Sequence, residues 1–186
     1  MKSSIMIGGK SDSYTRHQSD FYATPEDCTL ALLQHFGWLF ADHKVWEPAC
    51  GDGAISKVLL RDGFDVESTD LRDSGYGSHG VDFLTSELRG DAIITNPPFN
   101  LADQFINRSI QFGMPFAMLL KANYWHAAKR VDLFYKKTPR AVLSMAWRPA
   151  MAPVRGKSAT MDFIWTVWDA TDRQEPTQYF VARRNK

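Results

Sequence analysis

Two consecutive prolines follow a short apolar run near the middle of this 186-residue chain, and they limit how it can fold. The run Ala92-Ile93-Ile94 is typical of a buried strand, and Asn96-Pro97-Pro98-Phe99 begins two residues after it. Because proline has no backbone N–H and holds φ near about −65°, the chain must leave the sheet at this tetrapeptide. An amide before the exit and an aromatic ring after it set two carbonyl acceptors beside a flat apolar face. The tetrapeptide therefore predicts a receptor for a planar group that carries an amino group. Because the chain also carries a glycine turn, at residues 50–53, the tetrapeptide points to methylation of an exocyclic amine.

Apolar runs alternate with segments of helical spacing along the rest of the chain. We expect strands at 44–49, 65–70, 80–82, 91–95, 114–120, 141–146 and 163–168. We expect helices at 25–37, 54–61, 102–112 and 125–135, the first with a hydroxyl N-cap at Thr24. This alternation predicts an α/β fold with a parallel sheet and helices on both faces. Residues 1–20 lack apolar periodicity and are expected to form a flexible arm, and 21–186 to form a single domain.

Charge is unevenly distributed, although the net charge is only +1. Residues 1–114 hold 9 Lys and Arg against 16 Asp and Glu, and residues 115–186 hold 13 against 5. A basic C-terminal part indicates a surface for a polyanion, and a set of solvated faces is the alternative. No run approaches the roughly 20 apolar residues that span a bilayer. The two cysteines give no disulfide framework, so we expect a cytoplasmic protein.

A glycine turn follows the first expected strand, in Glu47-Pro48-Ala49-Cys50-Gly51-Asp52-Gly53. Glycines allow a sharp turn and a close approach of a ligand to the backbone at the carboxyl ends of the strands. The dinucleotide fingerprint is incomplete, because Ser56 stands where a third Gly or Ala is needed. The acidic turn would repel a pyrophosphate but suits a cofactor with an amine and a sulfonium, S-adenosylmethionine. Asp70 ends the second expected strand and is placed to bind ribose hydroxyls; a structural turn is the alternative.

These segments, in this order, resemble the amino-methyltransferases that modify DNA, particularly the small phage-encoded N6-adenine type. The resemblance covers about residues 20–120 and includes Thr24-Pro25 before the turn and Asp82-Phe83 after it. It implies a Rossmann-like class I methyltransferase fold with a mostly parallel seven-stranded sheet. It also implies S-adenosylmethionine as cofactor, S-adenosylhomocysteine as product, and no metal. The five histidines have no ligand spacing, which agrees with that.

The resemblance assigns a role to individual residues. Cofactor-binding residues would be Tyr22, Thr24, Pro25, Glu47, Ala49, Gly51, Gly53, Asp70, Asp82, Phe83 and Asn96, of which Asp82 and Phe83 would hold the adenine. An N-cap Asp beside a core Phe is the alternative for that pair. The target base would be held by Asn96, Pro97, Pro98 and Phe99. The oxygens of Asn96 and Pro97 would accept the amine's hydrogens, and Phe99 would stack on the ring.

Basic and aromatic residues after the fifth expected strand are candidates for nucleic-acid binding. They are Lys121, Tyr124, Trp125, His126, Lys129 and Arg130, with Arg148, Arg155 and Lys157 as a second set. Ordinary core packing is the alternative for the aromatic members. We expect a monomer or weak dimer that flips a DNA base from the helix.

Three other functions remain open from the sequence. The same catalytic centre occurs in enzymes that methylate RNA bases or protein glutamine, and the basic C-terminal part disfavours a protein target. A decayed, non-catalytic nucleic-acid-binding module is disfavoured by the intact Asn96 and Phe99. A nicotinamide-dependent oxidoreductase is disfavoured by the missing third glycine. About 87 residues follow Phe99, which leaves little room for a target-recognition domain, so we expect short or relaxed sequence specificity.

Overall fold

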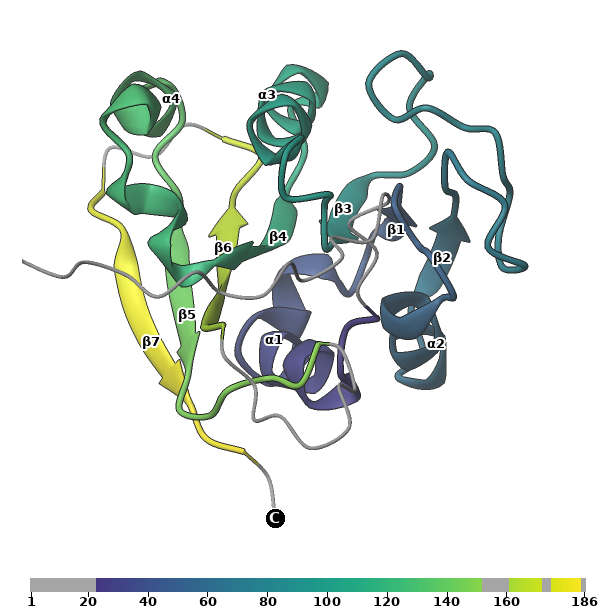
Figure 1. The fold of residues 1–186 in the computed structure, drawn as a ribbon, viewed down its shortest axis with the longest axis horizontal. Coiled ribbons are helices and arrows are strands. Elements are labelled where there is room, and N and C mark those ends of the chain that lie inside the picture. Colours follow the sequence, from purple (N-terminus) through teal and green to yellow (C-terminus); the bar gives the residue numbers. More distant parts are fainter. Residues whose placement is uncertain (1–22, 152–160, 172–174, 185–186) are drawn as a thin grey trace, which may run out of the picture.

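The computed structural model describes residues 23–151, 161–171 and 175–184, which form three layers, helices on both faces of one sheet (Figure 1). The strands are β1 (Lys44–Glu47), β2 (Asp65–Ser68), β3 (Ala92–Thr95), β4 (Phe116–Lys121), β5 (Ala141–Met145), β6 (Phe163–Trp168) and β7 (Gln178–Ala182). The α-helices are α1 (Glu26–Phe40), α2 (Ala54–Arg61), α3 (Ala102–Phe112) and α4 (Val131–Lys136). Two short 3-10 helices, η1 (Ala122–His126) and η2 (Ala128–Arg130), connect β4 to α4.

The seven strands lie in the order β2-β1-β3-β4-β6-β5-β7. Neighbouring strands are parallel from β2 to β4, and β5 is parallel to β7. Only β6 runs against its neighbours, β4 and β5, within this sheet. The sheet is therefore mostly parallel, as predicted, and the carboxyl ends of β1 to β4 meet along one edge. Ligands of open α/β sheets bind at such an edge.

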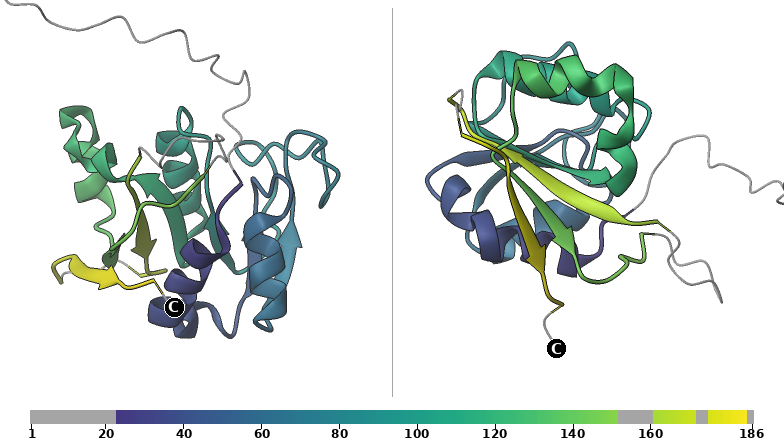
Figure 2. Two further views of the ribbon diagram at one scale, coloured as in Figure 1. Left: turned by 60° about the horizontal axis from the view of Figure 1, so that its bottom comes forward. Right: turned by 90° about the vertical axis from the view of Figure 1, so that its left-hand side faces the viewer.

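Two hydrophobic cores hold the layers together. On one face, α1 and α2 cover the sheet and bury large side chains that include Phe36, Phe40 and Leu59. On the other face, α3 contributes Phe105 and Ile106 to a core that contains Trp46 from β1. The views in Figure 2 show the sheet between these two helical layers. The strands β3 and β6 are almost wholly apolar because both of their faces are covered.

Three of the expected elements differ from the structure. No strand forms at 80–82, where Gly80 takes a left-handed φ of 72° and the neighbouring backbone makes only an isolated bridge between Thr69 and Ser78. The expected helix at 125–135 is interrupted at Ala127, which is extended, so 3-10 turns precede a short α4. The expected first helix continues past Gly37 to Phe40.

The sequence patterns also missed β7, which forms an edge of the sheet. Its residues are mostly exposed, with Tyr179 and Val181 among the most exposed apolar side chains of the described residues. A one-sided edge strand lacks the continuous apolar run that marked the buried strands. The expected arm at 1–20 lies outside the described residues. None of the helices in the described ranges is both long and apolar enough to cross a membrane.

Candidate active site

The glycine turn, residues 50–53, connects the end of β1 to α2. Gly51 and Gly53 have left-handed φ values of 53° and 80°. The Gly53 N–H donates to the Cys50 carbonyl at 2.8 Å, and the Gly53 carbonyl accepts from Lys57 in the first turn of α2. A Cβ at Gly53 would lie 2.4 Å from the Tyr76 ring, so only glycine fits there without movement of that ring.

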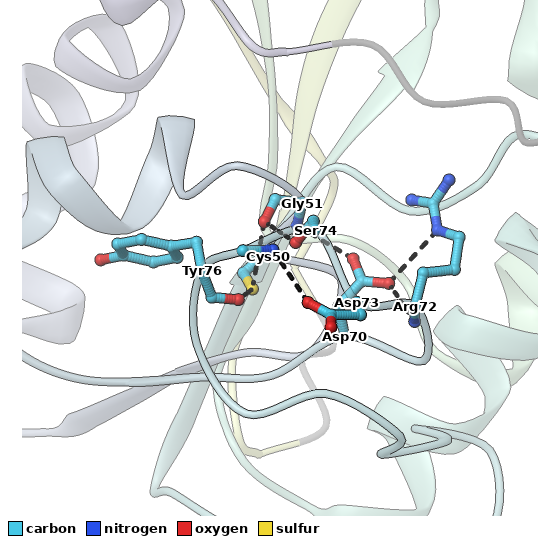
Figure 3. A network of polar contacts seen from close by, with 8 residues as sticks. Cys50, Gly51, Asp70, Arg72, Asp73, Ser74 and Tyr76 are labelled. Carbon is cyan, nitrogen blue, oxygen red and sulfur yellow. Dashed lines mark hydrogen bonds and ion pairs between the residues drawn. The ribbon is translucent and has the colours of Figure 1, made fainter.

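Residues 71–80, which we call the covering loop, lie against this turn (Figure 3). The Ser74 hydroxyl donates to the Gly51 carbonyl, and the Cys50 thiol lies 3.6 Å from the Tyr76 carbonyl. Burial raises the pKa of Cys50 to about 12, so this thiol stays protonated and packs against the loop. Ser78 in this loop bridges to Thr69, directly after β2.

Asp70 is buried directly beneath the glycine turn, and its carboxylate is already engaged. One oxygen accepts from the Gly51 N–H at 2.9 Å. The other accepts from the Arg72 backbone at 2.9 Å and from Arg72 Nε at 3.3 Å (Figure 3). Asp70 therefore fixes the shape of the turn and holds Arg72 close to it. Leu71, between them, is 61% exposed.

Glu47 faces α2 rather than solvent and is only 1% exposed. Its carboxylate accepts hydrogen bonds from the backbone N–H and the hydroxyl of Ser56, and the N–H bond measures 2.8 Å. Burial raises the pKa of Glu47 to about 8, the Ser56 bonds oppose that rise, and the charges of Asp52 and Asp70 add to it. Near neutral pH this carboxyl is therefore largely protonated and connects the end of β1 to α2.

A small pocket, the first pocket, lies between the glycine turn and the start of α1, with a volume of about 30 Å³. Several predicted cofactor residues line it, namely Thr24, Glu47, Ala49 and Asn96. Its ionisable lining consists of Glu47, Asp52 and Arg72. Because Glu47 is largely protonated, Asp52 and the Arg72 guanidinium are left to suit a ligand that carries one positive charge and one carboxylate.

The tetrapeptide 96–99 leaves β3 at the same edge of the sheet. The Asn96 side-chain nitrogen donates to the Thr24 hydroxyl at 3.1 Å, and Thr24 is buried just before α1. This bond orients the amide, so Thr24 contacts Asn96 as well as lining the first pocket. Pro97 is buried, and Pro98 lines the first pocket.

A larger pocket, the second pocket, lies on the other side of the tetrapeptide and has a volume of about 510 Å³. Phe99 forms one wall, and β4 and η1 form another. Lys121 and Arg130 line it, and none of its lining residues, all within the described part of the chain, carries a carboxylate. The Lys121 ammonium lies 4.0 Å from the centre of the Phe99 ring.

Asp103 on α3 holds the wall of the second pocket in place. It accepts from the Tyr124 hydroxyl at 2.5 Å and from Arg130 Nε at 2.9 Å. Arg130 also donates to the Tyr124 carbonyl at 2.6 Å and lies 3.9 Å from the centre of that ring. Burial alone would raise the pKa of Asp103, but these hydrogen bonds and the charges of Arg130 and Lys129 lower it below its usual value.

Two predicted nucleic-acid contacts are corrected by this arrangement. Tyr124 is only 5% exposed, and burial raises the pKa of its hydroxyl, which stays protonated and donates. Trp125 packs edge-on against Tyr124 and Phe134, and its Nε1 donates to Thr166 at 3.3 Å. Both rings pack in the core, the alternative considered from the sequence, although Tyr124 also lines the second pocket.

The basic members of the predicted set are more accessible. His126 and Lys129 are exposed near the second pocket, and Arg148 is exposed and paired with Asp162 at 2.9 Å. The Arg148 pair lies away from the lining of both pockets. Of the predicted residues, Tyr22, Arg155 and Lys157 lie outside the described part of the structure.

The predicted adenine-binding pair is also corrected. The Phe83 ring is 2% exposed and packs 4.6 Å from Phe105 and 5.1 Å from Trp46, so it has no face free for a ligand. Asp82 accepts from the Leu84 N–H at 2.9 Å, as in a turn. A turn Asp beside a core Phe was the alternative, and both residues lie outside the lining of the two pockets.

Sequence patterns missed several residues that shape the site. Arg72 lines the first pocket, and Leu71 beside it is exposed. Both residues directly follow Asp70, the acid at the end of the second expected strand, and that position could have marked them. Tyr76 and Asp103 contact residues more than 20 positions away, and no local signal marks them. Within the described residues, no group of three His, Cys, Asp or Glu side chains could hold a metal ion.

Comparison with known proteins gives structural neighbours but no match by sequence. No family model and no curated protein matches this chain. A proposed class I S-adenosylmethionine-dependent methyltransferase from Listeria monocytogenes superposes with a TM-score of 0.63 at 14% identity, over 91% of this chain and 68% of that one. A proposed RNA methyltransferase from Pyrococcus horikoshii gives 0.58 at 16%, over 78% of this chain and 85% of that one.

A third neighbour is larger than this protein. It is the modification subunit of a proposed type I restriction enzyme from Vibrio vulnificus, with a TM-score of 0.57 at 14% identity. The match covers 89% of this chain and 48% of that subunit. At such identities the likeness concerns the fold, and this chain has the Rossmann-like fold of class I methyltransferases.

Proposed function

We propose that this protein transfers a methyl group from S-adenosylmethionine to the exocyclic N6 of adenine in DNA. The observation that carries the proposal is a pair of pockets of different charge that meet at the tetrapeptide. Asn96 and Pro98 line the first pocket, where Asp52 faces Arg72, and Phe99 lines the second pocket, which is basic. A methyl donor that carries both charges and an anionic nucleic acid can therefore approach the same tetrapeptide from two pockets.

The side chains that line the first pocket fit the chemistry of this cofactor. Asp52 complements the positive charge of the donor, and Arg72 complements its carboxylate. Leu71, exposed beside Asp70, offers apolar surface to the adenine. The ribose hydroxyls would share Asp70 with Gly51 or replace Arg72 there. Because the pocket measures only about 30 Å³, Arg72 or the covering loop would move on binding.

The bound cofactor supplies an electrophilic methyl group, and the protein's residues prepare the amine that receives it. The Asn96 oxygen and the Pro97 carbonyl would accept the two N6 hydrogens, which favours a pyramidal nitrogen and stabilises the charge that develops there. Thr24 orients the amide by accepting its N–H at 3.1 Å. Phe99 would fix the plane of the base, so that the reaction gains mainly from proximity and orientation.

The charge of the second pocket favours a nucleic acid over a protein as substrate. Lys121 and Arg130 line it without a compensating carboxylate in its lining. An adenine inside a duplex cannot reach Asn96, so the enzyme would flip the base or act on single strands. DNA is our choice because the order of the segments resembles DNA amino-methyltransferases.

The test is methyl transfer from labelled S-adenosylmethionine to DNA, RNA and a protein mixture in parallel, followed by nucleoside analysis. We expect label in DNA as N6-methyladenine and a short or relaxed sequence context when the sites are mapped. Asn96→Ala should abolish the label, because the amide is the main acceptor, while calorimetry still detects cofactor binding. Lys44→Met, a change at the opposite end of β1, is the control.

The other outcomes identify the rival functions. Label in RNA or in protein glutamine would reject DNA as the substrate and keep the chemistry. Cofactor binding without label in any arm would indicate a decayed methyltransferase that binds nucleic acid. Binding of NAD instead of S-adenosylmethionine would reject the methyl-transfer chemistry altogether.

A further inference from the structure

The ammonium of Lys121 lies on the ring where the target base is proposed to stack. Lys121 ends β4, and its Nζ is 4.0 Å from the centre of the Phe99 ring. Lys121 pairs with Phe163 across β4 and β6, and the Phe163 ring lies 5.8 Å from that of Phe99. An ammonium at this distance covers the ring face, so a base and the ammonium cannot occupy that face together.

The other cation that lines the second pocket is committed to the protein. Arg130 donates to Asp103 and to the Tyr124 carbonyl, and its side chain is only 19% exposed. Lys129 is 71% exposed, pairs with Asp103 at 3.6 Å, and is not part of the pocket lining. Among the residues that the structure describes, no carboxylate forms an ion pair with Lys121. Lys121 is therefore the pocket cation that can move without breaking an ion pair.

The energies favour an exchange when a base arrives. Stacking of a base on an aromatic side chain contributes more free energy than a cation–π contact at a partly exposed site. The base can thus displace the ammonium, which stays within reach of the pocket on its four-carbon stem.

We propose that Lys121 is a phosphate-binding residue that covers Phe99 in the empty site and pairs with a phosphate next to the target base once the base has taken its place. This inference rests on the function proposed above and adds the residue that couples base entry to backbone binding. A nucleotide supplies both groups, since its base needs the ring and its phosphate needs the ammonium. A glutamine side chain supplies neither a ring nor a phosphate.

The test compares wild type, Lys121→Met, Lys121→Arg and the control Lys44→Met, which removes a lysine of similar exposure at the other end of the sheet. Methylation of one oligonucleotide is measured between 50 and 200 mM salt. One lost phosphate contact lowers the slope of log affinity against log salt by about 0.7–0.9. We expect Lys121→Met to raise KM at 50 mM salt, and this excess over wild type to shrink about threefold at 200 mM.

The remaining arms separate this assignment from a structural role. Lys121→Arg should restore the salt slope, because it restores the charge, and Lys44→Met should keep the wild-type slope. Cofactor affinity of Lys121→Met, measured by calorimetry, should match that of wild type and show that the variant is folded. A wild-type salt slope in Lys121→Met, with wild-type methylation intact, would overturn this assignment alone. Failure of the wild type to methylate any nucleic acid would overturn the proposed function together with it.

Discussion

Replacing Glu47 by Gln should make the protein more stable at neutral and alkaline pH. Glu47 is 1% exposed, and burial raises its pKa to about 8 from an ordinary value of 4.5. The folded protein thus keeps a proton that the unfolded chain releases. Stability from this group is complete below the unfolded pKa and falls as pH rises from about 4.5 to 8. Gln cannot ionise, and its oxygen can still accept from the Ser56 N–H.

The size of the effect follows from the width of that window. Between pH 5 and pH 7.5 the stability of the Gln variant relative to wild type should increase by about 3 kcal/mol. The buried Gln amide and the buried, protonated Glu47 can also differ in free energy by an amount that does not depend on pH. Such a difference moves the whole plot of unfolding free energy against pH up or down and leaves its slope unchanged. The measurement is urea unfolding of both proteins across this pH range.

Glu87→Gln, which removes an exposed carboxylate outside the lining of both pockets, controls for the loss of one negative charge. The reasoning is refuted if the Glu47→Gln and wild-type profiles run parallel from pH 5 to pH 7.5. It is also refuted if wild type gains on the variant as pH rises, since that would require an ionised Glu47 in the folded state.

Three further substitutions test the frame around the two pockets. Gly53→Ala should destabilise the fold by roughly 1–2 kcal/mol because an alanine must adopt the left-handed backbone conformation of Gly53. The clash of the new Cβ with the Tyr76 ring should add a further loss of stability. In urea unfolding, adding Tyr76→Ala should recover only the loss caused by that clash. Thr24→Val should lower kcat about fivefold by removing one hydrogen bond of about 1 kcal/mol to Asn96, while Thr24→Ser keeps it. Asp103→Ala should lower Tm by about 2–6 °C and weaken nucleic-acid binding more than cofactor binding in calorimetry.

Each of these has a result that would contradict it. Equal stabilities of Gly53→Ala and the double variant would exclude the steric contribution of the ring. Equal kcat values for Thr24→Val and Thr24→Ser would show that the hydroxyl does not orient Asn96. An unchanged Tm for Asp103→Ala would mean that the wall of the second pocket does not depend on that carboxylate.

The buried part of the sheet was predictable because its signal is local. The strands β3, β4 and β6 are short apolar runs, and each strand from β1 to β6 was expected close to its observed position. The exposed strand β7 and the loop around Gly80 were not predicted. No local sequence pattern indicates that β7 pairs with the sheet or that the residues around Gly80 do not. The expected strand at 80–82 rested on the alternation alone, without an apolar run to support it.

The site divides in the same way between local and distant signals. The position of Asn96 and Phe99 at the carboxyl end of β3 was predictable because prolines after a buried strand force the backbone out of the sheet at one place. Tyr124 and Trp125 were misplaced on the surface, because an aromatic residue near lysines has the same sequence pattern whether it packs inward or outward. What decides between the two is Asp103, 21 residues before Tyr124. A contact at that separation is set by the crossing of α3 over β4 and not by the local sequence.

The acidic and basic parts of the sequence contribute to different pockets in this fold. The first pocket takes its acids, Glu47 and Asp52, from the negative part of the sequence, because the first strand, turn and helix build that half of the edge. The second pocket takes Lys121 and Arg130 from the positive part, which begins with β4. In a parallel sheet, successive strands deliver their following loops to one edge, so a change of charge along the chain becomes a change of charge across the site. The tetrapeptide 96–99 follows β3, between the two, and that position lets it line both pockets, with Asn96 and Pro98 in the first and Phe99 in the second.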